Sequence, residues 1–136
     1  MISDNQLFEK ALDFALSNSY SPYSNIKVGA AALLSNGNVV CGANLENSSS
    51  PVSICAEQSM LCTINNHCNG VAVIAVAVAA IKEDKQFPIT PCGMCRQMLL
   101  ECEMRQGQNI RIIFNHDSNL KSINSARELL PYAFSL

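Results

Sequence analysis

The hydrophobic and polar positions of the first part of the chain change from a helical to a strand-like spacing. Apolar side chains recur every three or four residues through residues 4–18, behind a Ser-x-x-Gln capping box, which predicts an amphipathic helix. Two runs with strand character follow at residues 26–34 and 38–45. Asn36-Gly37 lies between them and is a strong hairpin signal, so these two strands are predicted to pair antiparallel.

The remainder of the chain alternates helical and strand patterns. Residues 55–65 and 92–104 have helical composition, and residues 71–81 form an almost wholly apolar run typical of a strand buried on both faces. Shorter patterns predict a polar connection at 82–90, a strand at 109–115, a weak strand at 120–123 and a short helix at 125–130. This order predicts an α/β layer fold whose later strands are joined by right-handed helical crossovers.

Length, composition and charge narrow the class of protein. With 136 residues, of which 49% are apolar, the chain fits one compact domain over residues 1–136. Its formal net charge is -2 and its basic residues are scattered, so no nucleic-acid or membrane partner is expected. The most apolar segment is about half of the ~20 residues that cross a bilayer, and no export signal opens the chain. We therefore expect a cytoplasmic protein.

The seven cysteines suggest reduced thiols or metal ligands, because their number is odd and no export signal accompanies them. A cysteine without a partner at ligand spacing is interpreted as a small core residue, and such a histidine as a surface or capping residue. The residues interpreted in this way are Cys41, Cys62, Cys68, Cys102, His67 and His116.

Three other cysteines have the spacing of metal ligands. Cys92 and Cys95 stand at i and i+3 at the start of a predicted helix, a pattern that alone is compatible with a redox, structural or accidental pair. Cys55 begins the other internal helix and adds a third thiol, with Glu57 two residues on. Helix N-termini carry roughly half a positive charge, which favours thiolates over thiols. Together these residues predict a zinc site.

Helix geometry limits which other thiol could be a fourth ligand. Cys62 and Cys102 each lie seven residues past a ligand, about 10 Å farther along their helices. Two sulfurs on one zinc are at most about 4.6 Å apart, which excludes both. The same distance does not exclude Cys41 or Cys68 as a fourth ligand, but neither has a second cysteine at ligand spacing. Three protein ligands and an open position are therefore favoured, which is the mark of a catalytic zinc.

Cys55-Ala56-Glu57 and Pro91-Cys92-Gly93-Met94-Cys95-Arg96-Gln97 closely resemble the zinc motif of the cytidine deaminase family, short-chain type. Further landmarks appear in family order at residues 21–24, 28–31, 44–47 and 128–131. The resemblance implies a three-layer α/β/α cytidine-deaminase-like fold with a mixed sheet of about five strands. It also implies one Zn²⁺ per subunit and a homotetramer.

The implied reaction is hydrolytic deamination of cytidine and deoxycytidine to uridine and deoxyuridine, with release of ammonia, as in pyrimidine salvage. Zinc activates a water molecule for attack on C4 of the base, and Glu57 moves the protons. Substrate contacts are implied at five positions. The resemblance implies that Asn44 and Glu46 bind the ribose hydroxyls and that the Ala56 backbone contacts the pyrimidine edge. It also implies that Phe134 covers the site of a neighbouring subunit and that Ile26 lies beside the nucleoside.

The chain departs from the family pattern around the site. Gln58 stands where short-chain members usually have an arginine that offsets the negative charge of three thiolates. Arg96 and the two helix N-termini are the remaining sources of compensation. Ile26 replaces a common aromatic residue and Ser50 a common tyrosine, so the reaction class is better determined than the substrate.

Three alternatives remain open at this point. A deaminase of a modified cytosine nucleoside such as blasticidin S would share the zinc motif, but retention of Asn44 and Glu46 favours ordinary ribose recognition. Deamination of RNA or DNA is disfavoured by the acidic balance of the chain. A zinc-stabilised interaction module without chemistry predicts that loss of Glu57 changes nothing.

Overall fold

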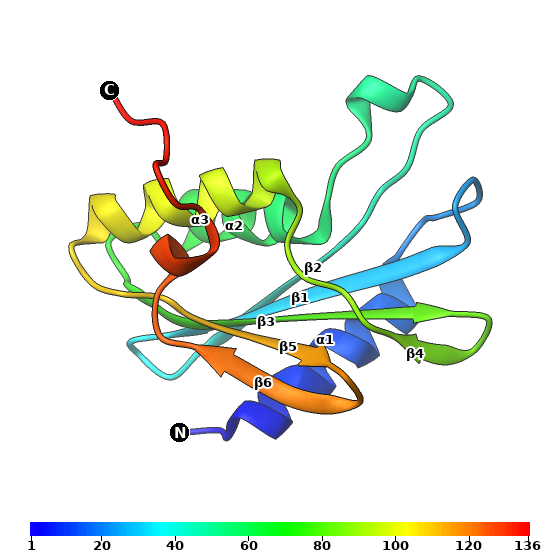
Figure 1. Ribbon diagram of the computed structural model, residues 1–136, viewed down its shortest axis with the longest axis horizontal. Helices are drawn as coiled ribbons and strands as arrows, with labels where there is room; N and C mark the ends of the chain where they lie inside the picture. The colour runs from blue at the N-terminus through cyan, green and yellow to red at the C-terminus, as the bar shows by residue number, and fades with distance from the viewer.

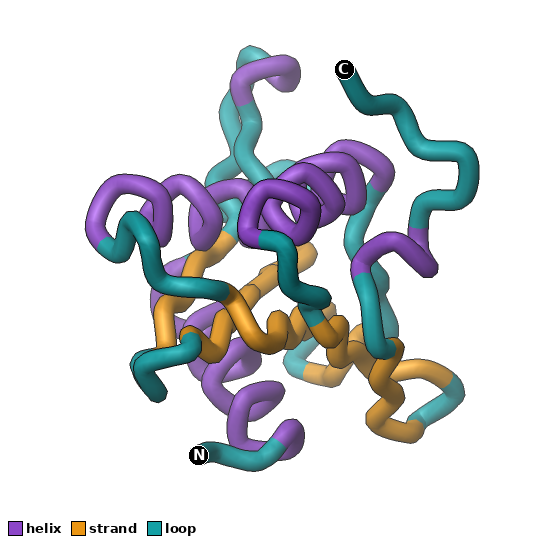
Figure 2. Tube along the Cα trace, turned by 90° about the vertical axis from the view of Figure 1, so that its left-hand side faces the viewer, coloured by secondary structure: helices purple, strands orange, loops and turns teal.

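A six-stranded mixed sheet lies between two layers of helices in the computed structural model, which describes residues 1–136 (Figure 1). Helix α1 (Asp4–Asn18) covers one face, and α2 (Ala56–His67) and α3 (Gly93–Gln106) cover the other, as Figure 2 shows from the side. The strands are β1 (Ile26–Leu34), β2 (Val39–Ala43), β3 (Val73–Lys82), β4 (Lys85–Phe87), β5 (Arg111–His116) and β6 (Asn119–Ile123). The predicted α/β/α layers are confirmed.

Strand β3 lies at the centre of the sheet, whose order is β2-β1-β3-β5-β6 with β4 paired to β3. The hairpin β1–β2 is antiparallel, as its Asn-Gly turn predicts. Strands β3 and β5 run parallel and are joined through α3, which is the expected helical crossover. This connection brings the start of α3 over the same face of the sheet as the start of α2 (Figure 1).

Two segments differ from their predictions. The connection predicted at residues 82–90 contains β4, because Glu83 and Asp84 both take positive φ, of 52° and 61°, and turn the chain straight back on β3. Such turns usually contain Asn or Gly, so the sequence carries little signal for this one. The short helix predicted at 125–130 is a single 3-10 turn, η2 (Ala126–Leu129), followed directly by Leu130 and Pro131.

Two apolar cores separate the layers, one on each face of the sheet. Glycines allow the closest approach of helix to strand. A Cβ at Gly42 of β2 would lie 2.5 Å from both the Ala56 carbonyl oxygen and the Met60 amide nitrogen, so only glycine lets α2 begin against the end of β2. In the same way, the absence of a Cβ at Gly29 of β1 lets the backbone of α1 at Ala11 approach the strand closely. The start of α2 is therefore firmly placed.

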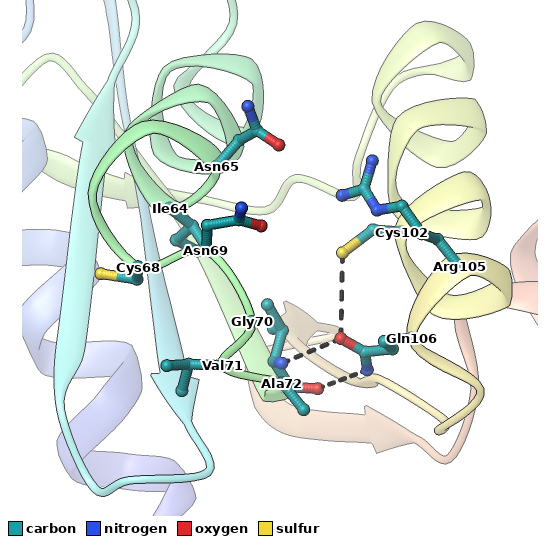
Figure 3. Close-up of a pocket in the computed structure, with 11 residues that line it drawn as sticks. Ile64, Asn65, Cys68, Asn69, Gly70, Val71, Ala72, Cys102, Arg105 and Gln106 are labelled. Atoms are coloured by element: carbon teal, nitrogen blue, oxygen red, sulfur yellow. Dashed lines mark hydrogen bonds between the residues drawn. The ribbon is translucent and has the colours of Figure 1, made fainter.

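The C-terminal ends of α2 and α3 are spread apart around a cavity of about 280 Å³ (Figure 3). Gln106 closes one side of the cavity. Its Oε1 accepts from the Val73 amide and its Nε2 donates to the Val73 carbonyl, both at 2.9 Å. Gln106 therefore supplies the start of β3 with the backbone partners that a neighbouring strand would offer. No helix of this fold has the length and apolarity to cross a membrane.

Candidate active site

Three cysteine thiols meet where α2 and α3 begin. Cys55 is the N-cap residue of α2, Cys92 is the N-cap of α3, and Cys95 lies one turn into α3. The sulfur atoms all lie within 4.8 Å of one another, with 3.8 Å between Cys55 and Cys92 and 3.5 Å between Cys92 and Cys95. Tetrahedral zinc with bonds near 2.3 Å requires sulfurs about 3.8 Å apart. The donor set and its spacing therefore fit zinc.

The electrostatics of the cluster prepare it for a cation. The pKa of Cys55 is lowered to about 6, mainly because the Cys95 thiol hydrogen-bonds to its sulfur; Cys92 adds to this effect, and burial opposes it. The pKa of Cys95 is raised by the same hydrogen bond and by burial. The cluster thus stabilises a thiolate at Cys55, and a bound divalent ion would displace protons from the thiols that ligate it.

Glu57 is buried in the first turn of α2, with only 4% of its surface exposed. Burial raises the pKa of its carboxyl, while hydrogen bonds from its own amide and from the Cys95 thiol act in the opposite direction. A carboxyl group in contact with the sulfur cluster, yet two residues from the nearest ligand in sequence, is suited to exchange protons beside the ion rather than to bind it.

Side chains next to the ligands hold the loops that carry them. Gln58 Oε1 accepts from the Cys55 amide at 2.9 Å, which helps to fix the backbone that carries the Cys55 thiol. The Arg96 guanidinium donates to three oxygens around the loop before Cys92, at distances of 2.7, 3.1 and 3.1 Å: the Pro91 carbonyl, the Leu129 carbonyl and Thr90 Oγ1. These bonds tether the loop, and compensation of the thiolate charge by Arg96 stays a prediction.

A short backbone bridge places the expected ribose contacts beside the ligands. Leu45 and Ile54 exchange both backbone hydrogen bonds at 2.9 Å, so the neighbours of Leu45 lie next to Cys55. The side chain of Asn44 accepts from the Val28 amide and donates to the Ile26 carbonyl, both at 2.9 Å. Strand β2 ends at Ala43, before the predicted Leu45, so the position of Asn44 depends on these bonds and not on strand pairing.

Glu46 makes contacts that the sequence did not indicate. Its Oε1 accepts from the amides of Tyr23, at 2.9 Å, and Ser24, at 3.2 Å, and its Oε2 accepts from the Ser24 hydroxyl. Residues 21–24 resemble a family landmark in the sequence, but that resemblance does not reveal a partner more than twenty residues away. Asn44 and Glu46 thus both reach the chain between Tyr23 and Val28.

The other predicted contacts lie in different settings. Ile26 is half-buried at the start of β1, and Ala56 is fully buried at the start of α2. Phe134 lies on the C-terminal tail and is 68% exposed, with its carbonyl held by Gln97 of α3 at 3.1 Å. Its exposure leaves it free to meet another molecule.

The remaining cysteines and histidines stay outside the cluster. Cys102 is buried, and Cys41 and Cys68 are half-buried, in accord with their interpretation as core residues. Cys62 is exposed on α2, so that interpretation is wrong for it: the face of α2 on which it lies points away from the sheet. The two histidines are exposed, as predicted.

Comparison with known proteins places these features in a family. The family model for the cytidine and deoxycytidylate deaminase zinc-binding region matches residues 1–108. The chain is 36% identical over 133 residues to the cytidine deaminase of Halalkalibacterium halodurans, covering 97% of this chain and 95% of that one. The crystal structure of cytidine deaminase from Burkholderia pseudomallei matches with a TM-score of 0.80 at 34% identity, over 98% and 100% of the two chains. The Mycobacterium tuberculosis cytidine deaminase structure matches with a TM-score of 0.79, also at 34% identity and over the whole of both chains.

Proposed function

The chain belongs to the cytidine and deoxycytidylate deaminase family, and on that premise we propose that it catalyses the zinc-dependent hydrolytic deamination of cytidine and deoxycytidine. Water is consumed, the exocyclic amine leaves as ammonia, and uridine or deoxyuridine is formed. The observation that carries the proposal is the cluster of three thiols at two helix N-termini, with a buried carboxyl group in contact with it. Residues 1–136 act as one catalytic domain.

The ligands for zinc are Cys55, Cys92 and Cys95. When bound, zinc supplies the Lewis acidity that activates water for attack on C4 of the base. Glu57 accepts a proton from the attacking water and delivers it to N3 of the base; it then takes the remaining proton from the hydroxyl group at C4, as the C4 carbonyl forms, and passes it to the departing amine. Its burial suits this work, because a pKa raised above the ordinary carboxyl range makes the group a better proton acceptor.

The surroundings of Glu46 support a nucleoside as substrate rather than a nucleotide. A cavity of about 540 Å³ opens beside Glu46, and Glu46 is the one charged residue in its lining, which is Tyr23, Ser24, Glu46, Asn47, Ser48, Ser50 and Ser53. A carboxylate without a Lys or Arg partner repels a phosphate group and accepts hydrogen bonds from uncharged hydroxyls. Asn44 keeps one N–H and one lone pair unused, which suits the same hydroxyls.

Ammonia release with a panel of substrates tests this function. Cytidine and deoxycytidine should be deaminated, and cytidine and deoxycytidine monophosphates should be turned over far more slowly because the carboxylate repels their phosphate. Blasticidin S serves as the competing nucleoside. Release from blasticidin S but not from cytidine would replace the proposed substrate, and release from none of the compounds by the zinc-loaded chain would refute the enzymatic function.

The assembly and location follow as part of the same proposal. Phe134 on the C-terminal tail is exposed and so is available to cover the site of a neighbouring subunit, which supports a homotetramer. Seven free cysteines, three of them zinc ligands, suit the reducing cytoplasm, where the reaction would serve pyrimidine salvage. Sedimentation equilibrium of the wild type and of a chain truncated before Phe134 tests the first point: a wild-type monomer contradicts it.

A further inference from the structure

The carboxylate of Glu46 is held by a turn whose residues Tyr23 and Ser24 line the same cavity of about 540 Å³ as Glu46. Residues 21–25 form this turn, closed by a hydrogen bond of 3.0 Å from the Asn25 amide to the Ser21 carbonyl. The turn is also fastened to the chain around Glu46, since the Tyr20 amide donates to the Asn44 carbonyl and the Glu46 amide donates to the Tyr20 carbonyl. The turn and the segment around Glu46 are therefore connected by backbone hydrogen bonds as well as by the Glu46 side chain.

Within this turn, Ser24 makes three separate contacts. Its hydroxyl donates to Glu46 Oε2, its amide donates to Glu46 Oε1, and the same hydroxyl oxygen accepts from the Ile26 amide at 3.0 Å. One hydroxyl thus links the residue expected to bind the ribose with the residue expected to lie beside the nucleoside. No other side chain contacts both of them through hydrogen bonds.

The contacts leave Glu46 with a defined capacity for one further partner. Oε1 already accepts two amide hydrogens and Oε2 accepts one hydroxyl hydrogen, so one lone pair of Oε2 remains for a substrate hydroxyl. A glutamate near the surface otherwise samples many rotamers, and ordering it on binding costs affinity. The same hydrogen bonds keep Glu46 ionised: burial alone raises its pKa, and the Ser24 and Tyr23 donors together lower it.

We propose that Ser24 is a positioning residue for the substrate, which acts by fixing the Glu46 carboxylate in the orientation that accepts a ribose hydroxyl. The proposal rests on the function proposed above. A preorganised carboxylate binds substrate and transition state equally, so its loss raises KM and leaves kcat nearly unchanged. Substrates that lack the 2′ and 3′ hydroxyls should be insensitive to the loss of the Ser24 hydroxyl.

Steady-state kinetics on cytidine and on 2′,3′-dideoxycytidine test this role. Ser24→Ala should raise KM for cytidine about fivefold, change kcat by less than about twofold, and leave kcat/KM for the dideoxynucleoside unchanged. Ser24→Thr keeps the hydroxyl and has room for the methyl group at an exposed position, so it should behave as wild type. Ser122→Ala, an exposed serine in β6, is the matched control. If Ser24→Ala fails to fold, Ser24→Cys tests the same split with a weaker donor.

A double variant separates action through Glu46 from any other role. Ser24→Ala should cause no further loss in a chain that already carries Glu46→Gln, because the group it positions has been changed. Equal losses on both substrates, or losses that multiply in the double variant, would overturn the role of Ser24 while cytidine turnover by the wild type still supports the deaminase function. A zinc-loaded wild type without cytidine turnover would refute the function and this role together.

Discussion

The two ends of the α2–α3 layer carry cysteines in opposite settings. At the N-terminal ends, three thiols lie within 4.8 Å of one another. At the C-terminal ends, Cys68 and Cys102 line a cavity of about 280 Å³ and take part in no such cluster (Figure 3). Burial raises the pKa of Cys102, whereas the pKa of Cys55 is lowered. Hydrogen bonds from the neighbouring thiols lower the pKa of Cys55, and the cysteines at the C-terminal ends have no such cluster around them, so the clustering of thiols distinguishes the two ends.

The two buried acids of the chain also differ from each other, in their hydrogen-bond partners and in the direction of their pKa shifts. Glu57 and Glu103 are each 4% exposed, on α2 and α3 respectively. Glu103 Oε2 accepts from the amides of Ile110 and Ala126 at 2.8 Å, and its Oε1 accepts from the Ser125 hydroxyl. Burial alone raises the pKa of Glu103, but these hydrogen bonds lower it overall, while the pKa of Glu57 stays raised. One carboxylate is satisfied internally and the other is available for chemistry.

The largest expected difference is in zinc content, between a variant that loses a thiol at the N-terminal end of α3 and one that loses a thiol toward its C-terminal end. Cys95 and Cys102 are both buried on α3, and Cys95→Ala and Cys102→Ala remove the same atoms. Cys95→Ala should reduce bound zinc from one ion per chain to almost none, because two thiolates hold the ion poorly. Cys102→Ala should keep its zinc and lose about 1 kcal/mol of stability. Metal analysis after gel filtration checks both, and equal zinc contents would break the comparison.

The two buried acids give the next contrast. Glu57→Gln should lower kcat on cytidine by about 10²- to 10⁴-fold, because the amide cannot shuttle protons, while zinc content stays at one per chain. Glu103 lies outside the candidate site, so Glu103→Gln should retain the wild-type kcat. Rates from ammonia release and zinc from metal analysis are measured on the same samples. Unchanged turnover in Glu57→Gln would instead support a zinc-stabilised interaction module.

Glu103 should show its importance in the pH dependence of stability. Its pKa is lowered in the folded chain, so the ionised carboxylate stabilises the fold above its unfolded pKa of about 4.3, and this contribution disappears as pH falls through the lower folded value. Glu103→Gln should therefore cost about 2 kcal/mol near pH 7 and progressively less below pH 4. Urea unfolding of the wild type and of Glu103→Gln measures the difference in their free energies of unfolding. Both chains release zinc when they unfold, so that contribution cancels in the difference. A difference that does not change with pH contradicts this role.

A smaller effect is expected at the cavity between the C-terminal ends. Gln106→Ala removes both bonds to the Val73 backbone and should cost about 1–3 kcal/mol without loss of zinc. Gln108→Ala, two residues on and exposed, is the control and should be nearly neutral. Thermal unfolding of the zinc-loaded chains measures both. Zinc loss in Gln106→Ala would show that the two ends of the helix layer are coupled.

Most of the fold was predictable because its signals are local. The apolar run at 71–81 and the Asn-Gly turn indicate the central strand and the hairpin, and the structure contains both. Strand β4 was missed because Lys85–Phe87 is short and its turn is made of Glu83 and Asp84 in an unusual conformation for those residues. Element boundaries differ from the predicted ones by at most two residues, and the start of α2 shifts by one because Cys55 is a cap held by Gln58.

The candidate site was predictable to the extent that it depends on spacing. Three cysteines at two helix starts indicate a shared metal before any coordinates are known. The partners of Glu46, Glu103 and Gln106 were not predictable, because each reaches a backbone group far away in the sequence or across a tight turn. Such contacts depend on tertiary packing and leave no periodic pattern.

X-ray absorption at the zinc edge on the purified chain tests the central claim most directly. Three thiols with an open corner beside Glu57 predict one zinc per chain with three sulfur neighbours at about 2.3 Å and one oxygen or nitrogen neighbour at about 2.0 Å. A spectrum that requires four sulfur neighbours would contradict the account, because the ion would then be structural and its corner closed.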